Sequence, residues 1–526
     1  MGTYLNPGNN GFQKILQSEY VDKTGLIALI NRTVGTMEML SCISRPRRFG
    51  KSYAAKMLCV YYDCSCDSRA LFDDKEVAQS QGYLKHLNQY NVINLDITSF
   101  VSDAVRTNMP LSDVPNMIVD AVYRELTEIY PELAGKNLTD AMIGCVEKSG
   151  KEFVFIIDEW DALIREAKSD GAVQKKYLNF LRGWFKNSSF TPKVVAAAYM
   201  TGILPIKKDG SQSAISDFKE VTILNPGRFV EFTGFTEREV HLLCDKYGMD
   251  FEDVRQWYDG YDFQGYEAIY NPYSVMCAMQ EQKCRSYWRK TSAAESLMTY
   301  INMDYDGLQE TISRLISGEE IEVDTESFEN DFETFRSRDD VLTLLIHLGY
   351  LTWHEEKETA CIPNEEVRTE FRKILNGRNV NQKWIELLGH SRKLLEDTFA
   401  RNAEAVARAI EEIRGTQYAP TFYNDEQSLR YVLKFAYIAA LDQYLKVEEL
   451  PSGKGIADVV YLPKQKSVLP ALVVELKWNK PSEGAIRQIK ERDYPAVLKG
   501  YGGEIVIVGI SYDAKKKEYS CVIERI

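Results

Sequence analysis

A short apolar run that leads through a Gly-Lys-Ser loop into a helix is the feature that most restricts the fold of this chain. The run is Met39–Ile43, the loop ends in Gly50, Lys51 and Ser52, and helical spacing covers Tyr53–Tyr62. A strand, a loop and a helix in this order are the context of a phosphate-binding loop. In such a loop backbone N–H groups bind phosphates, the lysine reaches the β- and γ-phosphates, and the serine coordinates Mg²⁺.

The loop departs from the full GxxxxGK[ST] pattern at one position. The first glycine of that pattern would be residue 45, which is Arg45 in this chain. Between this position and Gly50 the loop carries Arg47, Arg48 and Phe49, which we include among the candidate nucleotide-binding residues. Because Gly-Lys-Ser alone also occurs by chance in loops, the prediction of a nucleotide site needs a second signal.

A buried-strand pattern that ends in two acidic residues, Phe153–Glu159, supplies the second signal. Asp158 would hold Mg²⁺ through water, and Glu159 would polarise the water that attacks the γ-phosphate. The alternative is a parallel strand that ends in Asp-Glu for structural reasons alone. That alternative is weaker in a chain that also carries the Gly-Lys-Ser loop.

Two more apolar runs, Asn91–Ile97 and Lys193–Tyr199, are strand candidates for the same sheet. The second leads into Thr201, at the end of a predicted core strand. Thr201 would either sense the γ-phosphate or make ordinary strand-end hydrogen bonds, and the sequence favours neither role. Together the runs predict an α/β domain built around a nucleotide site.

Near the C-terminus, two apolar runs flank a polar link that contains two prolines. The runs are Ile456–Leu462 and Ala471–Trp478, which predict a β-hairpin. In a hairpin that is regular about the middle of the link, Asp458 lies opposite Glu475, with Cβ atoms roughly 5 Å apart. Lys477 shares the face of Glu475. Two carboxylates this close repel unless a cation lies between them, and Mg²⁺ suits oxygen ligands.

A metal ion on Asp458 and Glu475 would activate water and stabilise a phosphoryl transition state, and Lys477 would hold that water or the scissile phosphate. A charged, exposed strand face is the alternative. From residue 451 to 526 the chain has 13 Lys and Arg against 9 Asp and Glu, although its net charge is −13. This local basic excess suits a phosphate-backbone substrate, whereas the whole chain is too acidic to coat nucleic acid.

The length and composition predict a multidomain protein of the cytoplasm. With 526 residues the chain is too long for one core, and about three domains are expected. No apolar run approaches the roughly 20 residues of a membrane span, and the first residues lack the apolar segment of a signal peptide. Ten scattered cysteines without a CxxC pair fit reduced thiols.

The C-terminal hairpin resembles the PD-(D/E)XK nuclease signature, with Asp458 as its aspartate and Glu475-Leu476-Lys477 as its ExK. The resemblance extends to two flanking helices. The upstream helix, Asn424–Tyr444, carries Glu426 in its first turn, where such nucleases often have another acidic residue. The alternative for Glu426 is a favourable charge at a helix N-terminus. The downstream helix, Glu483–Tyr494, carries Gln488, which corresponds to a polar residue that often faces the nuclease site.

Short motifs along most of the chain resemble the bacterial AAA-ATPase-like family, which commonly carries a C-terminal PD-(D/E)XK nuclease domain. Within that family the loop usually reads RPRRFGKS, so Arg45 does not imply an inactive site. One departure is Arg430, where the nuclease helix often has histidine. The motifs are YVDKT (20–24), RPRRFGKS (45–52), IIDEWDAL (156–163), TGILPI (201–206), FTGFTEREV (232–240), WYDGY (257–261) and YNPYS (270–274).

The resemblance and the patterns together predict an α/β protein of three parts. Residues 1–235 would form a P-loop AAA-type ATPase core, and residues 401–526 a PD-(D/E)XK, restriction-endonuclease-like α/β domain. Residues 236–400 would form a helical lid and a winged-helix-like region. The expected elements of this middle region are helices Glu237–Tyr247, Phe251–Trp257, Asp339–Leu348 and Glu365–Leu375, with strands Tyr350–Glu355 and Glu358–Ile362.

The expected function is that of an ATPase and an ATP-controlled, Mg²⁺-dependent nuclease acting on DNA, and the resemblance suggests a role in defence against mobile DNA. ATP and Mg²⁺ would be its cofactors and nucleic acid its partner, with no membrane. One alternative is an ATP-bound switch whose nuclease fold only grips nucleic acid, and another is an ATPase with an inactive nuclease domain. The sequence leaves open DNA or RNA, ATP hydrolysis or binding alone, homo-oligomerisation, and the arginine finger, for which Arg47, Arg48, Arg182 and Arg228 are candidates.

Overall fold

The computed structural model describes residues 2–167, 170–206, 208–209, 212–213, 215, 217–263, 266–288, 308–326, 328, 337–375, 382–414, 433, 436–442, 444–452, 455–463, 469–491 and 503–525. Contacts divide the chain into two units. The first unit comprises residues 1–290 and 322–370, and the second comprises residues 291–321 and 371–526.

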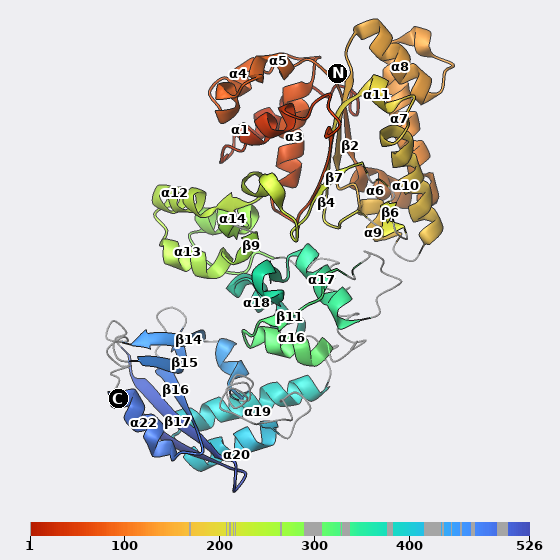
Figure 1. The fold of residues 1–526 in the computed structure, drawn as a ribbon. Helices are drawn as coiled ribbons and strands as arrows, with labels where there is room; N and C mark the ends of the chain where they lie inside the picture. The colour runs from red at the N-terminus through yellow and green to blue at the C-terminus, as the bar shows by residue number, and fades with distance from the viewer. Residues whose placement is uncertain are drawn as a thin grey trace. The chain divides into compact units, whose positions relative to one another are not determined.

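A five-stranded parallel sheet forms the centre of the first unit (Figure 1). Its strand order is β2-β3-β4-β1-β7, so β4 lies between the strand that precedes the Gly-Lys-Ser loop and the strand that ends in Asp158. Four of the strands, β1 to β4, are buried along almost their whole length, as expected when helices cover both faces. Their bounds are β1 Leu40–Ser44, β2 Asn91–Asp96, β3 Phe153–Asp158, β4 Val195–Gly202 and β7 Lys219–Val221.

Alternate residues of these strands belong to two separate cores, one on each face of the sheet. Ile43 and Ile156 pack with helix α3 on one face, whereas Leu95 and Ile157 pack with helices α6 to α10 on the other. The first group of helices is α1 Asn10–Leu16, α2 Gly25–Asn31, α3 Lys51–Tyr62, α4 Arg69–Phe72 and α5 Tyr83–His86. The second is α6 Ile97–Arg106, α7 Val114–Ile129, α8 Leu138–Ser149, α9 Ala162–Glu166 and α10 Gly171–Phe185.

The four strands predicted in this region are confirmed. The ends of the first three lie within one residue of the prediction, whereas the last strand begins two residues and ends three residues later than predicted. The prediction for the last one was wrong at its start, because residues from Thr191 to Val194 form the helical turn α11 and the strand begins at Val195. Pro192 lies within that turn, where its fixed φ suits a helix start. The two-stranded sheet of β5 Lys208–Asp209 and β6 Gln212–Ser213 follows β4.

A small helical lid follows the parallel sheet. Helix α12 is fixed at its start by a capping box, in which Thr236 and Glu239 exchange side-chain-to-backbone hydrogen bonds. The predicted helix from Glu237 to Tyr247 is confirmed, and the next helix extends one residue beyond the prediction, to Tyr258. The lid comprises α12 Glu237–Tyr247, α13 Phe251–Tyr258 and α14 Pro272–Glu281, with strands β8 Phe235–Thr236, β9 Tyr261–Phe263 and β10 Tyr266–Tyr270.

The predicted order of helix, two strands and helix in the middle region is confirmed. The elements are α17 Arg338–Leu348, β12 Thr352–His354, β13 Thr359–Cys361 and α18 Glu365–Leu375. The sequence patterns missed a third strand, β11 (Ile321–Glu322), which lies beside β13. A two-residue strand is too short to show a period, so nothing in its pattern distinguishes it from a loop.

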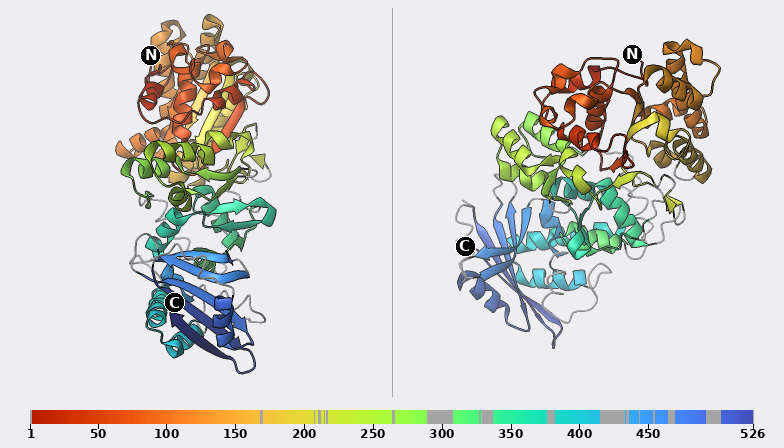
Figure 2. Two further views of the ribbon diagram at one scale, coloured as in Figure 1. Left: turned by 90° about the vertical axis from the view of Figure 1, so that its left-hand side faces the viewer. Right: turned by 45° about the horizontal axis from the view of Figure 1, so that its top comes forward.

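The second unit contains a mixed five-stranded sheet of order β14-β15-β16-β17-β18, which can be followed in Figure 2. Strands β16 and β17 are parallel, and the other neighbours are antiparallel. The strands are β14 Tyr444–Ser452, β15 Gly455–Pro463, β16 Ala471–Trp478, β17 Ile505–Asp513 and β18 Glu518–Arg525. The described helices are α16 Leu308–Ile316, α19 Gln382–Phe399, α20 Ala403–Arg414 and α22 Ser482–Glu491.

The predicted helix from Asn424 to Tyr444 is wrong at its end. Residues from Ile438 to Asp442 form a short 3-10 helix, and Tyr444 is already the first residue of strand β14. Tyr444 pairs with Pro463 across the sheet, and such pairing overrides a helical spacing of apolar residues. Most of the predicted helix, including Glu426 and Arg430, lies outside the described residues.

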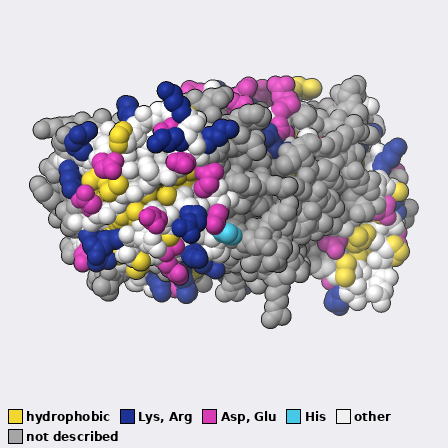
Figure 3. All heavy atoms as spheres, turned by 90° about the horizontal axis from the view of Figure 1, so that it is seen from below, with side chains coloured by type: hydrophobic (Ala, Val, Ile, Leu, Met, Phe, Trp, Pro, Cys, Tyr) yellow, Lys and Arg dark blue, Asp and Glu magenta, His cyan; other side chains and the backbone are white. Residues whose placement is uncertain are grey.

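No helix in the described part of the chain is both long and apolar enough to cross a membrane. All ten cysteines are free thiols, and five of them are buried. On the face drawn in Figure 3, Lys and Arg side chains lie among Asp and Glu side chains around a strip of apolar atoms.

Candidate functional site

The Gly-Lys-Ser loop turns sharply into helix α3 at Gly50, whose φ of +83° favours glycine. The helix begins at Lys51, a residue that is only 4% exposed. Its ammonium donates hydrogen bonds to the carbonyl oxygens of Arg45 (3.1 Å) and Pro46 (3.0 Å), so the loop is folded around it. Burial lowers the pKa of Lys51, and the nearby Glu159 carboxylate opposes that shift.

Glu159 lies between two cations where strand β3 ends. Its Oε1 is 3.7 Å from the Nζ of Lys51, and its Oε2 is 2.5 Å from the Nη2 of Arg165. The residue has a φ of +50°, which is uncommon for a side chain other than glycine and is often found at functional sites. Burial raises the pKa of the Glu159 carboxyl, while Lys51 and Arg165 act in the opposite direction.

Thr201 joins the two acidic residues at the end of β3. Its hydroxyl donates a hydrogen bond to Oδ1 of Asp158, and it accepts one from the backbone N–H of Glu159 at 3.3 Å. This arrangement follows from the strand order, because β4 lies directly beside β3. Thr201 therefore makes the strand-end hydrogen bonds considered in the sequence, and its contact with a phosphate stays a prediction.

Asp161 is a site residue that the sequence patterns did not reveal. Its buried Oδ2 accepts hydrogen bonds from the backbone N–H groups of Ile203 (3.1 Å) and Leu204 (2.9 Å) and from Nε of Arg165 (3.1 Å). The carboxylate thus fixes the segment after Thr201 and orients the guanidinium that contacts Glu159. The IIDEWDAL motif contains Asp161, and Arg165 follows two residues after its end, but only their side-chain directions show these roles.

Arg45, which stands where the full loop pattern has glycine, is completely buried. It donates hydrogen bonds to Thr233 Oγ1 (3.2 Å) and to the carbonyl oxygens of Ser44 (3.3 Å) and Pro226 (3.2 Å). Its guanidinium also lies 4.9 Å from the centre of the Phe263 ring. Burial lowers the pKa of Arg45 to about 9. The side chain therefore attaches the loop to the lid.

The next loop residues also contact the lid and the segment after it. Arg48 donates a hydrogen bond to the carbonyl oxygen of Tyr287 (2.8 Å) and stacks on the Tyr273 ring at 4.3 Å. Phe49 is fully buried, with its ring edge-on to Tyr261 at 5.1 Å. Arg47 is half-buried, and burial lowers its pKa. Lid and loop are consequently one packed structure.

A pocket of about 710 Å³ opens over this loop, within the usual size range for small-molecule sites. Several of the predicted residues line it together with Arg165: Arg47, Arg48, Phe49, Gly50, Lys51, Ser52 and Glu159. A second group of lining residues is mainly apolar: Tyr20, Val21, Phe232, Phe235, Tyr273 and Met276. All of these except Met276 lie in motifs that the sequence linked to a family without giving them a role.

Ser52 and Asp158 fit a Mg²⁺ ion in the type of atom that they offer, because hydroxyl and carboxylate oxygens are hard donors. Asp158 and Thr201 are not among the residues that line the pocket. Among the described residues, no three His, Cys, Asp or Glu side chains gather as a metal site.

In the second unit, the register of the predicted hairpin is confirmed. Val459 pairs with Val474, and continuing this register by one residue sets position 458 opposite position 475. Glu475 is 1% exposed, and its Oε1 accepts hydrogen bonds from Lys477 Nζ (3.2 Å) and from the amide of Gln488 on α22. The structure therefore brings Glu475, Lys477 and Gln488 together, whereas the side chain of Asp458 and all of Glu426 lie outside the described residues.

Comparison with known proteins bears on the region that contains the first of these two sites. Residues 8–211 match a family described as predicted AAA-ATPase. The N-terminal region is AAA-ATPase-like. This region contains Lys51, Ser52, Asp158, Glu159 and the end of β4, so the match supports ATP as the ligand of the pocket. It does not extend to the second unit.

The chain is also similar to one further protein in sequence and to two solved structures. A protein of Azotobacter chroococcum mcd 1, described as an uncharacterized protein in the vnfD 5' region, is 23% identical over 534 residues, which cover 96% of this chain and 95% of that protein. A STAND protein with a tetratricopeptide repeat sensor from Pyrococcus horikoshii has a TM-score of 0.25 and 13% identity over 80% of this chain, and the match spans 48% of its own length. The Aeropyrum pernix ORC2 protein, solved as ADPNP–ADP complexes, has a TM-score of 0.30 and 11% identity, covering 69% of this chain and 98% of that chain.

Proposed function

We propose that this protein is an ATP-controlled, Mg²⁺-dependent nuclease that acts on DNA, with an ATPase in its first unit and a nuclease site in its second. The observation that carries the ATPase part is the pocket over the Gly-Lys-Ser loop. It gathers a buried lysine, a serine at a helix start and an acidic residue held by an arginine in the region that matches the family of predicted AAA-ATPases.

In the ATPase site, the ammonium of Lys51 would exchange its contact with Glu159 for phosphate oxygens. The carbonyls of Arg45 and Pro46 keep that ammonium near the loop, so only a short movement is needed. Ser52 and Asp158 would hold Mg²⁺, which neutralises the charge that develops on the phosphates. Glu159 would accept a hydrogen bond from the attacking water and so orient it.

In the nuclease site, three observations support the proposal. The buried carboxylate of Glu475 is bonded to Lys477 and Gln488. Position 458 falls opposite position 475 in the hairpin register. Helix α22 packs on the sheet face that carries Val473 and therefore also Glu475, two residues further along. Asp458 and Glu475 would hold Mg²⁺, and Lys477 would bind the scissile phosphate or the attacking water.

A second candidate function is an ATP-bound switch that does not hydrolyse its nucleotide. The contact of 2.5 Å between Glu159 and Arg165 supports it, since this contact holds the carboxylate on a cation rather than leaving it to orient water. Hydrolysis requires that the pair separates or that Glu159 binds water with its other oxygen. Measurable ATP turnover that depends on Glu159 would exclude the switch.

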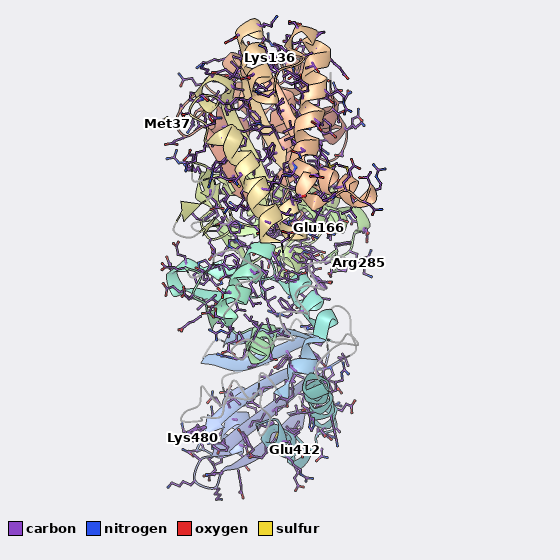
Figure 4. All side chains as sticks on the ribbon, turned by 90° about the vertical axis from the view of Figure 1, so that its right-hand side faces the viewer. Met37, Lys136, Glu166, Arg285, Glu412 and Lys480 are labelled. Carbon is purple, nitrogen blue, oxygen red and sulfur yellow. The ribbon has the colours of Figure 1, made fainter. Side chains whose placement is uncertain are left out.

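The decisive experiment is a cleavage assay on single-stranded DNA, duplex DNA and RNA, with and without ATP and Mg²⁺. We expect Glu475→Ala and Lys477→Ala to abolish Mg²⁺-dependent cleavage while ATP binding stays intact. Lys480→Ala is the matched control, because Lys480 lies just beyond the end of β16 and is exposed (Figure 4). Unchanged cleavage in Glu475→Ala and Lys477→Ala would refute the nuclease assignment.

A further inference from the structure

A thiol, an imidazole and a carboxylate form a chain of contacts in the first unit, outside the nucleotide pocket. The Sγ of Cys361 lies 3.5 Å from Nε2 of His354, and Nδ1 of the same imidazole lies 2.9 Å from Oδ2 of Asp262. The residues come from three strands, β13, β12 and β9. All three side chains are partly exposed, so small molecules can reach them.

The strand register supports this grouping independently of the side-chain distances. Thr352 pairs with Cys361, and His354 pairs with Thr359 two residues along the same strands. Residues two apart share a face of a sheet, so Cys361 and His354 are diagonal neighbours on one face. Asp262 is held beside them, because its backbone N–H donates a hydrogen bond to Thr352 Oγ1 at 2.9 Å.

The polarity of the contacts suits thiol activation. The Nδ1–H of His354 donates to the Asp262 carboxylate, which leaves Nε2 as the acceptor for the thiol proton of Cys361. A carboxylate in this position fixes the tautomer of the imidazole and stabilises its protonated form. Among the residues that the structure describes, no other partly buried thiol contacts a histidine paired with a carboxylate, and burial raises the pKa of each of these thiols: Cys64, Cys66, Cys277 and Cys521.

We infer that Cys361, His354 and Asp262 form an activated-thiol site, and that hydrogen peroxide is the electrophile that modifies it. The thiol proton passes to Nε2 of His354, and the thiolate sulfur attacks one peroxide oxygen. An S–O bond forms as the O–O bond breaks, and the leaving hydroxide takes the proton from His354 as water. Cys361 becomes a sulfenic acid and peroxide is reduced to water. This inference does not depend on the proposed ATPase or nuclease activity.

The first test measures alkylation of each cysteine by iodoacetamide in the native full-length chain at pH 7, by mass spectrometry of the peptides. Iodoacetamide reacts with the thiolate, and a base within reach of the sulfur increases the fraction of thiolate. We therefore expect Cys361 to react about tenfold faster than Cys64 or Cys277. Equal rates would overturn the inference. Because the rates are compared within one sample, this test needs no variant.

The second test separates activation from simple exposure. His354→Gln keeps a side chain of similar size but removes the proton acceptor, and Asp262→Asn removes the charge that stabilises the imidazolium. Both should slow alkylation of Cys361 several-fold, whereas His241→Gln, at an exposed histidine of helix α12, should not. Thermal unfolding of each variant checks that the fold is retained. An unchanged rate in a folded His354→Gln protein would show that Cys361 is merely exposed.

The third test examines the peroxide step directly. After brief treatment with hydrogen peroxide, dimedone should label Cys361 before any other cysteine, and the label should be lost in Cys361→Ser. His354→Gln should reduce labelling in parallel with its effect on alkylation. Preferential labelling of another cysteine, such as Cys64, would contradict the assignment of peroxide to this site.

Discussion

Glu159 and Arg165 form a close ion pair in the nucleotide pocket, with 2.5 Å between Oε2 and Nη2. Arg165 is itself oriented by Asp161, which also binds the backbone after Thr201. The residue expected to orient water is thus restrained by a group whose position depends on the end of strand β4. A rearrangement at the end of β4 would therefore change the contact between Arg165 and Glu159.

The pH dependence of ATP hydrolysis tests this pair. Glu159 must be ionised to accept a hydrogen bond from water, and burial raises its pKa. Activity is therefore lost as the pH falls through that raised value. Arg165→Ala removes a cation that lowers the pKa, so the acid limb of the kcat profile should move to higher pH. Arg165→Lys should keep the limb near its original position, and an unshifted limb in Arg165→Ala would contradict the role of the pair. In Glu159→Gln the limb should disappear, with slow turnover and retained ATP binding.

Loss of the loop lysine should remove nucleotide binding. Lys51→Ala deletes charge-assisted hydrogen bonds to phosphate, worth about 2–3 kcal/mol, so the Kd for ATP should rise by about 30- to 150-fold in calorimetric titrations. Lys56→Ala is a matched control on the same helix, because Lys56 is exposed and does not line the pocket. Normal binding in the Lys51 variant would refute the phosphate-loop assignment.

Substitution of two arginines in the same loop should affect different properties, the stability of the first unit in one case and ATP binding in the other. Arg45→Gln breaks the bonds to Thr233 and Pro226 in a buried site, which should lower the free energy of unfolding of the first unit by about 2–3 kcal/mol. Arg47 lines the pocket, so Arg47→Gln should weaken ATP binding with little loss of stability. The thermal unfolding midpoint of each variant measures the loss of stability, and ATP titrations measure the loss of affinity. The reverse pattern would show that Arg45 contacts the nucleotide.

Two glycines that end helices provide a further comparison. Gly349 and Gly248 both have left-handed backbones, with φ of +81° and +67°. A Cβ at Gly349 would lie 2.6 Å from Cβ of Pro46 in the loop, whereas one at Gly248 meets no atom within 4 Å. Each alanine variant should cost about 1–2 kcal/mol of stability from its backbone alone. Only Gly349→Ala should also weaken ATP binding, by about tenfold, because it displaces the loop. Equal ATP affinity in the two variants would show that the loop tolerates this displacement.

In the second unit, Gln488→Ala should slow cleavage about tenfold through a misplaced Glu475 carboxylate, which loses one hydrogen bond of about 1.5 kcal/mol. Arg487→Ala is the neighbouring control, because Arg487 is exposed on the same helix. Cleavage rates of the Gln488→Ala and Arg487→Ala variants, measured at saturating Mg²⁺, test this difference. Equal slowing in both variants would mean that the helix contributes only general stability.

The sequence predicted those parts that depend on local patterns. Strands that are buried on both faces are continuous apolar runs. Every predicted end of β1, β2 and β3 lies within one residue of the observed end. The hairpin register also followed from symmetry about its link, as the pair Val459 and Val474 confirms. In each case the decisive interactions lie between residues that are close in sequence or that share one period.

The parts that escaped prediction depend on contacts between distant segments. Arg45 is held by Pro226, Thr233 and Phe263, about 180 residues or more along the chain. Glu159, which pairs with Arg165, has a left-handed backbone that no pattern of residue types reveals. The contact of Cys361 with His354 and Asp262 likewise appears only when three strands are placed side by side.

The two sites also differ in how much of the chain must be made before each can form. Residues that line the nucleotide pocket extend from Ser18 to Gln280, so its walls need more than half of the polypeptide. The C-terminal cluster needs only the short stretch from Asp458 to Gln488. Because domains fold in order as a chain leaves the ribosome, the pocket can bind ATP before the C-terminal cluster exists. Under the proposed function, the site that would control cleavage is therefore in place during synthesis before the site that would cleave.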